Sequence, residues 1–234
     1  MIKIKKIIPT ALLLTSISSA ALADNWNVGA SASYANIDGT ANDTQVTGAG
    51  AVVAQTRGAT GGDANFPFGS IFLEYAKTMD KNLDLIIGLD YVPFKAEIDS
   101  KSFADLNTTG SVASNTSGTR KATLELKNYA TLYLQPTYKI GGGTAVFGKV
   151  GYIHGDVKIS GSNTATSSTI NATDTLNGYV VGLGVQHNIN KNVFVRLEGS
   201  FTAHDDVTAT DSLGTKFTAD SELIAGKLSI GYSF

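Results

Sequence analysis

The feature that most constrains this chain is a period of two in its apolar residues, recurring in segments of about ten residues. In residues 82–92 every second side chain is apolar, from Leu83 to Tyr91, whereas Asp84 and Asp90 fall on the opposite face. Strict alternation of this kind indicates a β-strand with two different faces and not a helix. Seven further segments show it, at residues 26–34, 68–78, 122–138, 145–153, 177–187, 192–202 and 222–234.

The connections between these eight segments alternate in length. Three are short and carry Gly, Asn or Asp, which suit tight hairpins: residues 79–82, 140–144 and 188–192. Four are long and polar: residues 37–67, 95–121, 160–175 and 203–220. Strands of this length cross a bilayer at a tilt, and short turns opposite long loops are typical of outer-membrane barrels. The sequence predicts an all-β, eight-stranded antiparallel transmembrane β-barrel with short periplasmic turns, four long extracellular loops and both termini in the periplasm.

A soluble β-sandwich also alternates, and it is the main alternative fold. The regular change between long and short connections argues against it, because Greek-key connections rarely keep such an order. Aromatic residues also stand at the ends of many apolar faces, where they would form the girdles found at membrane interfaces. These residues are Trp26, Tyr34, Tyr91, Tyr138, Tyr152, Tyr179, Tyr232 and Phe234.

Composition excludes several classes of protein. Cys is absent and only three His are present, so disulfides, thiolate metal sites and cysteine nucleophiles are ruled out. The formal net charge of −2 argues against nucleic-acid binding. No apolar run after the first 25 residues is long enough for a membrane-spanning helix.

The first 23 residues have the layout of a secretory signal peptide. Lys3, Lys5 and Lys6 precede the short apolar stretch 7–14, and a small-x-small site ends at Ala23. A retained anchor is the alternative, but the apolar stretch is far shorter than the ~20 residues that a spanning helix needs. We therefore expect cleavage between Ala23 and Asp24. The barrel domain is then 24–234, with 15 basic and 20 acidic residues once the three lysines are removed.

Charged residues on the polar faces predict a lumen that contains ion pairs. An eight-stranded barrel has an interior only wide enough for side chains, and buried charges need partners there. We expect Arg196, Glu198, Glu125 and Lys127 at the centre of this network. Solubilising the lumen is the simpler interpretation, and a gate or proton path is the functional one. The full set is Glu74, Asp84, Asp90, Glu125, Lys127, Lys149, Arg196, Glu198 and Lys227.

Residues 178–201, GYVVGLGVQHNINKNVFVRLEGSF, resemble the sixth and seventh strands of OmpA-type and opacity-type outer-membrane barrels. Those proteins often show a Gly-x-Gly-Val strand, a short turn and then Arg-Leu-Glu-Tyr; here Gly199 stands where Tyr is common. The tail 227–234, KLSIGYSF, is similar to their terminal strand. The resemblance extends over the barrel in layout and is specific over about forty residues. Since the chain stops at Phe234, we expect no peptidoglycan-binding domain.

The resemblance also implies partners. The barrel-assembly machinery reads such a terminal strand as an insertion signal, here carried by Leu228, Ile230, Tyr232 and Phe234. Periplasmic chaperones would deliver the chain, and outer-membrane lipid with lipopolysaccharide would surround a monomeric barrel in a Gram-negative bacterium. An extracellular ligand of unknown identity would contact the loops.

Catalytic and metal sites are not apparent. His154, His187 and His204 are scattered, and none joins a serine and an acid in a lipid A deacylase pattern. The acidic stretches 38–43 and 205–206 match no calcium loop. We therefore expect no catalytic residue, no cofactor and no bound metal.

The four loops, roughly ninety residues in all, remain the most plausible functional surface, because loops of such length usually carry function or are disordered. The apolar stretch 64–68 within them is either a partner contact or the rim of the second strand, and the rim is favoured. The sequence thus predicts a structural or surface-interaction protein of the outer membrane. A narrow channel for small solutes or ions is the second hypothesis, and an outer-leaflet lipid-modifying enzyme is a third.

Overall fold

A computed structural model describes residues 24–44, 56–94, 96–106, 117–163, 168–210 and 216–234. These residues form β-strands joined by tight turns, and they contain no helix able to cross a membrane. In chain order the strands are β1 (Asp24–Thr44), β2 (Thr56–Asp80), β3 (Leu83–Val92), β4 (Ala96–Leu106), β5 (Ser117–Gly141), β6 (Thr144–Asn163), β7 (Ser168–Asn188), β8 (Val193–His204), β9 (Val207–Thr210) and β10 (Lys216–Ser233).

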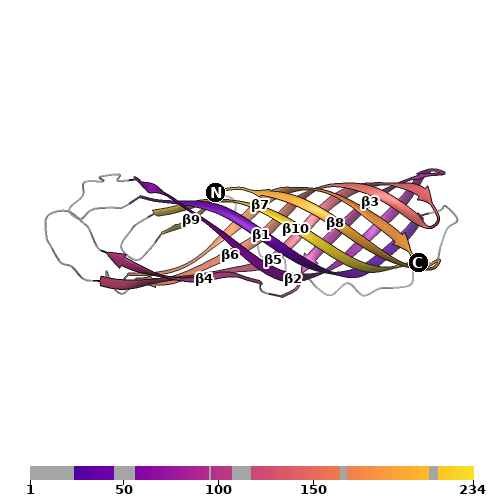
Figure 1. The fold of residues 1–234 in the computed structure, drawn as a ribbon. Helices are drawn as coiled ribbons and strands as arrows, with labels where there is room; N and C mark the ends of the chain where they lie inside the picture. Colours follow the sequence, from indigo (N-terminus) through magenta and orange to yellow (C-terminus); the bar gives the residue numbers. More distant parts are fainter. Residues whose placement is uncertain (1–23, 45–55, 95, 107–116, 164–167, 211–215) are drawn as a thin grey trace, which may run out of the picture.

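The antiparallel ladders close on themselves. Their order is β1-β2-β3-β5-β6-β7-β8-β10, and β10 returns to β1 along a register that runs from Asn27 opposite Ser233 to Thr44 opposite Lys216. Closure gives each of these eight strands two neighbours around the turn end, whereas residues 56–70 of β2 pair only with β1 among the described strands. The all-β antiparallel barrel is confirmed, and Figure 1 shows it as a cylinder whose strands are tilted relative to its axis.

Two positions in the ring are each occupied by two shorter strands instead of one continuous strand. β4 pairs with β5 beyond the point where β3 ends, so β3 and β4 are one strand broken at residues 93–95. β9 likewise pairs with β10 beyond β8, after a break at residues 205–206. Pro93 lies in the first break, where its missing N–H costs no ladder bond. The ten strands therefore occupy the eight positions expected from the sequence.

The predicted strand lengths and loops need correction. We expected strands of about ten residues, whereas β2 and β5 have 25 residues each. Most of the expected loops 37–67, 95–121 and 160–175, and part of 203–220, is strand. The three short turns lie where they were predicted. The reason is that a ladder continues wherever both strands keep their partners, and these Thr-rich stretches suit extended backbone.

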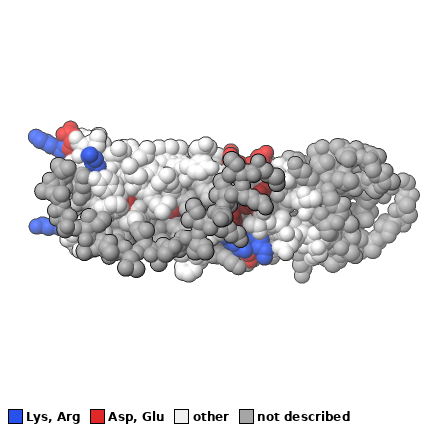
Figure 2. Space-filling model, turned by 180° about the vertical axis from the view of Figure 1, so that it is seen from behind, with Lys and Arg blue, Asp and Glu red and all other residues white. Residues whose placement is uncertain are grey.

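Apolar side chains form a belt around the outside of the barrel near its turn end. Leu183 is 74% exposed and Leu197 is 64% exposed, values that burial in a soluble core would not allow. Trp26 and Tyr75 pack with tilted rings in the turn-side girdle, and Tyr152 and Tyr179 pack edge to face in the loop-side girdle, at ring distances of 5.3 and 5.4 Å. Figure 2 shows charged side chains gathered beyond the two ends of this largely uncharged wall. A belt of this composition matches a hydrocarbon environment.

A β-bulge in β5 changes which face of that strand points inward. The register with β6 shifts between Lys127 and Ala130, and Asn128 has a positive φ of 50°. Asn tolerates this left-handed conformation better than most residues. On the loop side of the bulge Leu126 is buried opposite Val157, so the side chains next to it face outward. A single alternation through 122–138, which we predicted, is therefore wrong on that side.

Candidate functional site: two layers in the lumen

The centre of the lumen is an ion pair between Arg196 of β8 and Glu74 of β2. Glu74 is fully buried, and both of its oxygens accept hydrogen bonds from the Arg196 guanidinium, one of them at 2.8 Å. Tyr133 donates to the same carboxylate at 2.5 Å and Asn27 at 3.0 Å, while Arg196 Nε donates to Gln186 at 2.7 Å. The carboxylate thus has four donors, which is the condition for a buried charge to be stable.

An aromatic cage surrounds this pair. The guanidinium lies 4.5 Å from the ring centre of Phe194, 5.5 Å from Phe72 and 5.8 Å from Phe147. Each distance is within the range of a cation–π interaction, which is strongest away from water. The three rings pack around the guanidinium, and the Glu74 carboxylate holds it through hydrogen bonds.

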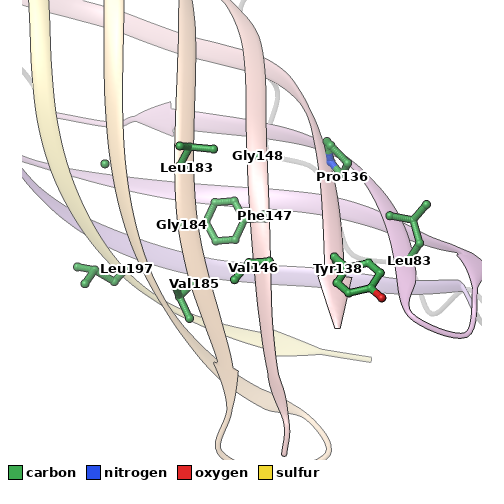
Figure 3. Close-up of a pocket in the computed structure, with 11 residues that line it drawn as sticks. Leu83, Pro136, Tyr138, Val146, Phe147, Gly148, Leu183, Gly184, Val185 and Leu197 are labelled. Atoms are coloured by element: carbon green, nitrogen blue, oxygen red, sulfur yellow. The ribbon is translucent and has the colours of Figure 1, made fainter. Parts of the chain in front are cut away.

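Glycines on neighbouring strands make room for the cage. The residue paired with Phe194 across the ladder is Gly231, and a Cβ there would lie 2.2 Å from the Phe194 ring. The same relation joins Gly184 to Phe147, and Figure 3 shows the two side by side. Gly29 with Phe72 and Gly88 with Tyr133 repeat it. Each aromatic ring covers a bare stretch of neighbouring backbone, as in the rescue of sheet glycines by aromatic partners.

Two more ion pairs lie beside this centre. Lys149 of β6 contacts Glu198 of β8 at 2.5 Å, and its ammonium sits 4.4 Å from the ring centre of Tyr133. Lys227 of β10 contacts Asp90 of β3 at 2.8 Å. Together with the central pair they form what we name the charge layer: Glu74, Asp90, Lys149, Arg196, Glu198 and Lys227.

The remaining three residues of the predicted network lie elsewhere. Asp84 pairs with Lys139 at 2.8 Å near the turn end, where the lysine side chain is 43% exposed. Glu125 and Lys127 lie beyond the bulge on the outer face, 3.4 Å apart. Our expectation that these two belong to the centre with Arg196 and Glu198 is therefore wrong. Arg196 pairs with Glu74 instead, because the bulge turns Glu125 and Lys127 away from the lumen.

The loop side of the lumen is filled by apolar side chains, which we name the apolar plug. Its residues are at most 8% exposed. Phe66 belongs to the plug, and the partly buried Phe68 packs against it with the two rings 5.9 Å apart, whereas Asn65 and Pro67 are exposed. The two phenylalanines of the stretch 64–68 therefore pack in the lumen and do not form the rim, which corrects our expectation. The buried members are Ala35, Phe66, Val92, Leu126, Tyr129, Ile153, Val157, Leu176, Val180, Val207, Leu223 and Ala225.

The charge layer and the apolar plug meet at a small cavity of about 40 Å³. Lys149, Glu198, Asp90 and Lys227 line one side of it, and plug residues such as Ile153 line the other. This volume holds a few water molecules at most. Buried side chains therefore fill the lumen of the described barrel at two successive levels.

A wider apolar groove of about 670 Å³ lies on the outer wall, across β5, β6 and β7 (Figure 3). Pro136, Val146 and Leu183 line it, and the outward glycines Gly148 and Gly199 leave its floor open. It lies within the apolar belt, so lipid chains are its natural surroundings. Tyr138 is the one titratable residue among those that line it.

The three histidines contact neutral groups. His154 Nδ1 lies 2.9 Å from Asn177, and His187 Nδ1 lies 3.0 Å from Thr144. His204 lies between Tyr129 at 3.3 Å and Ser221 at 3.2 Å. Burial lowers the pKa of His204, and the nearby charge of Asp205 opposes this only in part. Within the described residues no group of three potential ligands is arranged for a metal ion.

Comparison with known proteins agrees with this geometry. The model of the family described as outer membrane protein beta-barrel domain matches residues 10–219. The chain belongs to this family of outer-membrane β-barrels. It is accordingly an integral protein of the bacterial outer membrane, as expected from its resemblance to OmpA-type and opacity-type barrels.

Solved structures of outer-membrane proteins are similar to this chain at low identity. The outer membrane protease OmpT of Escherichia coli is 12% identical, with a TM-score of 0.51 over 93% of this chain and 100% of that one. OprG of Pseudomonas aeruginosa is 15% identical, with a TM-score of 0.47 over 90% and 95% of the two chains. Ail of Yersinia pestis is 13% identical, with a TM-score of 0.43 over 89% and 99%. No curated protein is detectably similar in sequence.

The residues predicted for the assembly signal and the signal-peptide cleavage site lie at the two ends of the barrel domain. Leu228, Ile230, Tyr232 and Phe234 lie on the outer face of the terminal strand, each at least half exposed. Ala23 lies outside the described residues, and Asp24 begins β1. Sequence reasoning missed the inward aromatic rings. The available signal was the set of glycines on the polar faces, since Gly29, Gly88, Gly184 and Gly231 each have an aromatic partner on the next strand, although Gly182 has none.

Proposed function

We propose that the protein is a non-catalytic outer-membrane barrel with a closed lumen, whose loop end serves as a surface for interaction. The observation that carries this proposal is the packing of the lumen at two levels, by the charge layer and by the apolar plug. A path for solutes would require both to open. Opening the charge layer would also cost the buried Glu74 carboxylate its hydrogen bonds from Arg196, Tyr133 and Asn27.

Conductance in planar bilayers tests the closed lumen. We expect no steady open state from refolded protein. A narrow channel would instead show a steady current that changes in Glu198→Ala, which alters the charge layer. Lys127→Ala is the matched control, because this lysine lies outside the lumen and should not affect the current in either case.

The orientation of the barrel is part of the proposal. The two ends of the barrel domain meet at the turn end, where Trp26 and Phe234 exchange backbone hydrogen bonds of 3.0 and 2.9 Å. An exported chain inserted from the periplasm would keep this end inside and place the loop end outside. Because the chain has no cysteine, single substitutions report orientation directly. On intact cells an impermeant maleimide should label Asp206→Cys and not Lys81→Cys; the reverse pattern would refute the orientation.

Lipid chemistry is the test for an enzyme. With no acid–base–nucleophile group assembled in the described residues, we expect lipid A from cells with and without the protein to have the same mass spectrum. Loss or gain of an acyl chain that depends on the protein would overturn the non-catalytic assignment.

Assembly partners follow from the terminal strand. We propose that the barrel-assembly machinery recognises the outward residues of β10, with periplasmic chaperones upstream and lipopolysaccharide around the finished barrel. Deleting Phe234 should reduce outer-membrane levels and leave export intact, because export depends on the leader alone. Normal outer-membrane levels of the deletion variant would refute this role of the tail.

A further inference from the structure

The apolar groove on the lipid-facing wall ends near two of the three short turns. It continues into a second hollow of about 890 Å³, so that it runs along β6 from Val146 to Val150. Figure 3 shows Val146 at the end nearest the turns. At about 3.3 Å per residue this stretch measures about 13 Å, close to the ~15 Å of one leaflet in a hydrocarbon core ~30 Å thick. The two hollows share Pro136, Gly148, Leu183 and Gly199. The groove therefore has about the length of a lipid chain in one leaflet.

The two turns at this end of the groove form one surface. Residues 140–144 join β5 to β6 and residues 188–192 join β7 to β8, and they lie side by side because β6 pairs with β7. The N–H of Asn188 donates to the carbonyl of Gly143 at 2.8 Å, which links the two turns directly. We name these two turns, together with Lys139 next to the first, the paired turns.

The paired turns combine apolar and basic side chains. Ile140 and Ile189 are each 59% exposed, a position that suits the membrane interface better than bulk water. Lys139 precedes the first isoleucine and Lys191 follows the second by two residues, and both lysines are exposed. Basic side chains beside exposed apolar ones are typical of surfaces that lie among lipid headgroups. The paired turns thus have the composition of a membrane-interface surface.

Acidic residues are absent from this part of the sequence. Residues 126–155 and 175–197, which include both turns and the adjoining strands, contain no Asp or Glu. Asp84 of the neighbouring β3 contacts Lys139 at 2.8 Å, whereas Lys191 forms no ion pair within the described residues. The paired turns therefore carry positive charge that is offset only at Lys139.

The third short turn, residues 79–82, is the natural comparison. It also has an exposed apolar residue, Met79, and an exposed lysine, Lys81. Its lysine follows directly on Asp80, which is exposed as well. Opposite charges are therefore mixed in this turn, and no hollow of the wall borders it among those along β6.

The backbone of the first paired turn is open to close approach. Gly141, Gly142 and Gly143 all have positive φ, which glycine adopts without steric cost. A Cβ at either of the first two would meet nothing within 4 Å. A headgroup can therefore come close to this turn beside Lys139.

We propose that the groove and the paired turns together bind one anionic phospholipid, with an acyl chain in the groove and the headgroup against the turns. The groove is continuous with the apolar belt, so its occupant must bring a hydrocarbon chain. The lysines at its end require a negative charge. A free anion would leave the groove without a partner, and an uncharged chain would leave the lysines without one, whereas an anionic lipid supplies both.

The proposal rests on the orientation proposed above only for the choice of leaflet. If the turn end is periplasmic, the lipid belongs to the inner leaflet of the outer membrane. Maleimide labelling tests that orientation. The test of the lipid site does not depend on it, because vesicles carry the same lipid in both leaflets.

Quenching of a single tryptophan by brominated lipid measures the preference. Trp26 is the only tryptophan of the chain, so Trp26→Phe with Leu134→Trp places one reporter beside the groove. Leu134 faces outward opposite Val150 and does not line either hollow. In vesicles we expect brominated phosphatidylglycerol to bind at least about threefold more strongly there than brominated phosphatidylcholine. Trp26 of the unmodified protein, on β1 four ring positions from β6, should report a ratio near one.

Lysine variants test the headgroup end. Lys139→Gln with Lys191→Gln should bring the ratio at the Leu134→Trp reporter close to one. Lys77→Gln with Lys81→Gln is the matched control, because it removes the same charge from exposed lysines elsewhere at the turn end and should leave the ratio unchanged. Lys191→Gln alone, which breaks no ion pair within the described residues, should lower the ratio in part.

Glycine variants test the groove. Gly148→Leu fills its floor and should lower the ratio toward one, since the chain loses its place. Gly226→Leu is the matched control, because Gly226 of β10 has nothing within 4 Å of its Cβ position and lines neither hollow. It should leave the ratio unchanged.

Four results would overturn the proposal. A ratio of one at Leu134→Trp, in barrels folded by circular dichroism, would show that this wall prefers no anionic lipid. Equal loss in the two lysine pairs would show a general effect of charge. An unchanged ratio in Gly148→Leu would show that the groove holds no chain. Loss of the preference in inorganic phosphate, at constant ionic strength, would identify the free ion as the occupant of the turns.

Discussion

The half of the barrel next to the three turns, the turn half, and the half next to the loops, the loop half, are built from the same strands. In the turn half the charged side chains lie inside and apolar ones outside, and in the loop half this arrangement is reversed. On β6 the inward residues are Phe147 and Lys149 in the turn half and Ile153 and Val157 in the loop half. On the outside Val150 gives way to charged residues beyond the loop-side girdle. The difference teaches that a period of two specifies a strand but not which face is inside. Lipid around the turn half and water around the loop half decide that.

The largest expected effect comes from the centre of the turn half. Arg196→Met leaves the Glu74 carboxylate buried without its countercharge, which should cost about 3–5 kcal/mol of unfolding free energy. Urea unfolding of the refolded barrel in detergent measures it. Adding Glu74→Gln should recover much of the loss. Lys139→Ala removes a half-exposed ion pair and should cost less than about 1 kcal/mol. Equal costs for Arg196→Met and Lys139→Ala would contradict the difference between a buried and an exposed ion pair.

Glycines on the two faces of the wall should respond differently to the same change. Gly231→Ala places a Cβ 2.2 Å from the Phe194 ring and forces the aromatic cage to move, at a cost of about 1–3 kcal/mol. Gly199→Ala faces outward with nothing within 4 Å and should cost nothing measurable. Unfolding in urea compares them, and a cost at Gly199 equal to that at Gly231 would show that the inside is assigned wrongly.

The apolar plug should behave as a protein core. Ile153→Val removes one buried methyl group from a side chain that is 1% exposed, and should cost about 1 kcal/mol. Ile224→Val makes the same change on the lipid side, where the side chain is 63% exposed in the protein, and should cost little. Thermal gel-shift of both variants measures the difference. Equal shifts would place Ile153 outside the plug.

The smallest expected effect is a pH dependence confined to the loop half. Since the pKa of His204 is lowered by burial, the unfolded chain takes up its proton first, near its ordinary pKa of 6.5. The stability contributed by neutral His204 is therefore complete above that pH and declines as the pH falls below it. Thermal unfolding at pH 7.5 and 5.5 should show a smaller drop in His204→Gln than in wild type. An identical drop in both proteins would show that His204 is not the cause of the pH dependence.

The belt, the three turns and the order of the ring could be predicted because lipid contact imposes alternation on local sequence. The partner of Arg196 could not, because strand tilt and stagger bring β8 next to Glu74 of β2, 122 positions away. The bulge at Asn128 was also missed. One residue there reverses the inward face, and Glu125 and Lys127 were consequently placed in the lumen. The extended strands were read as loops because their polar outer faces face water.

The most direct test of the change in surroundings is a scan of outward positions along β6. Single cysteines replacing Val150, Tyr152, His154, Asp156 and Lys158 would each carry a fluorophore in barrels reconstituted into vesicles. We predict strong quenching by brominated lipid at Val150 and Tyr152, and strong quenching by aqueous iodide at Asp156 and Lys158. Lipid quenching that continues through Lys158, or iodide quenching already at Val150, would contradict the account.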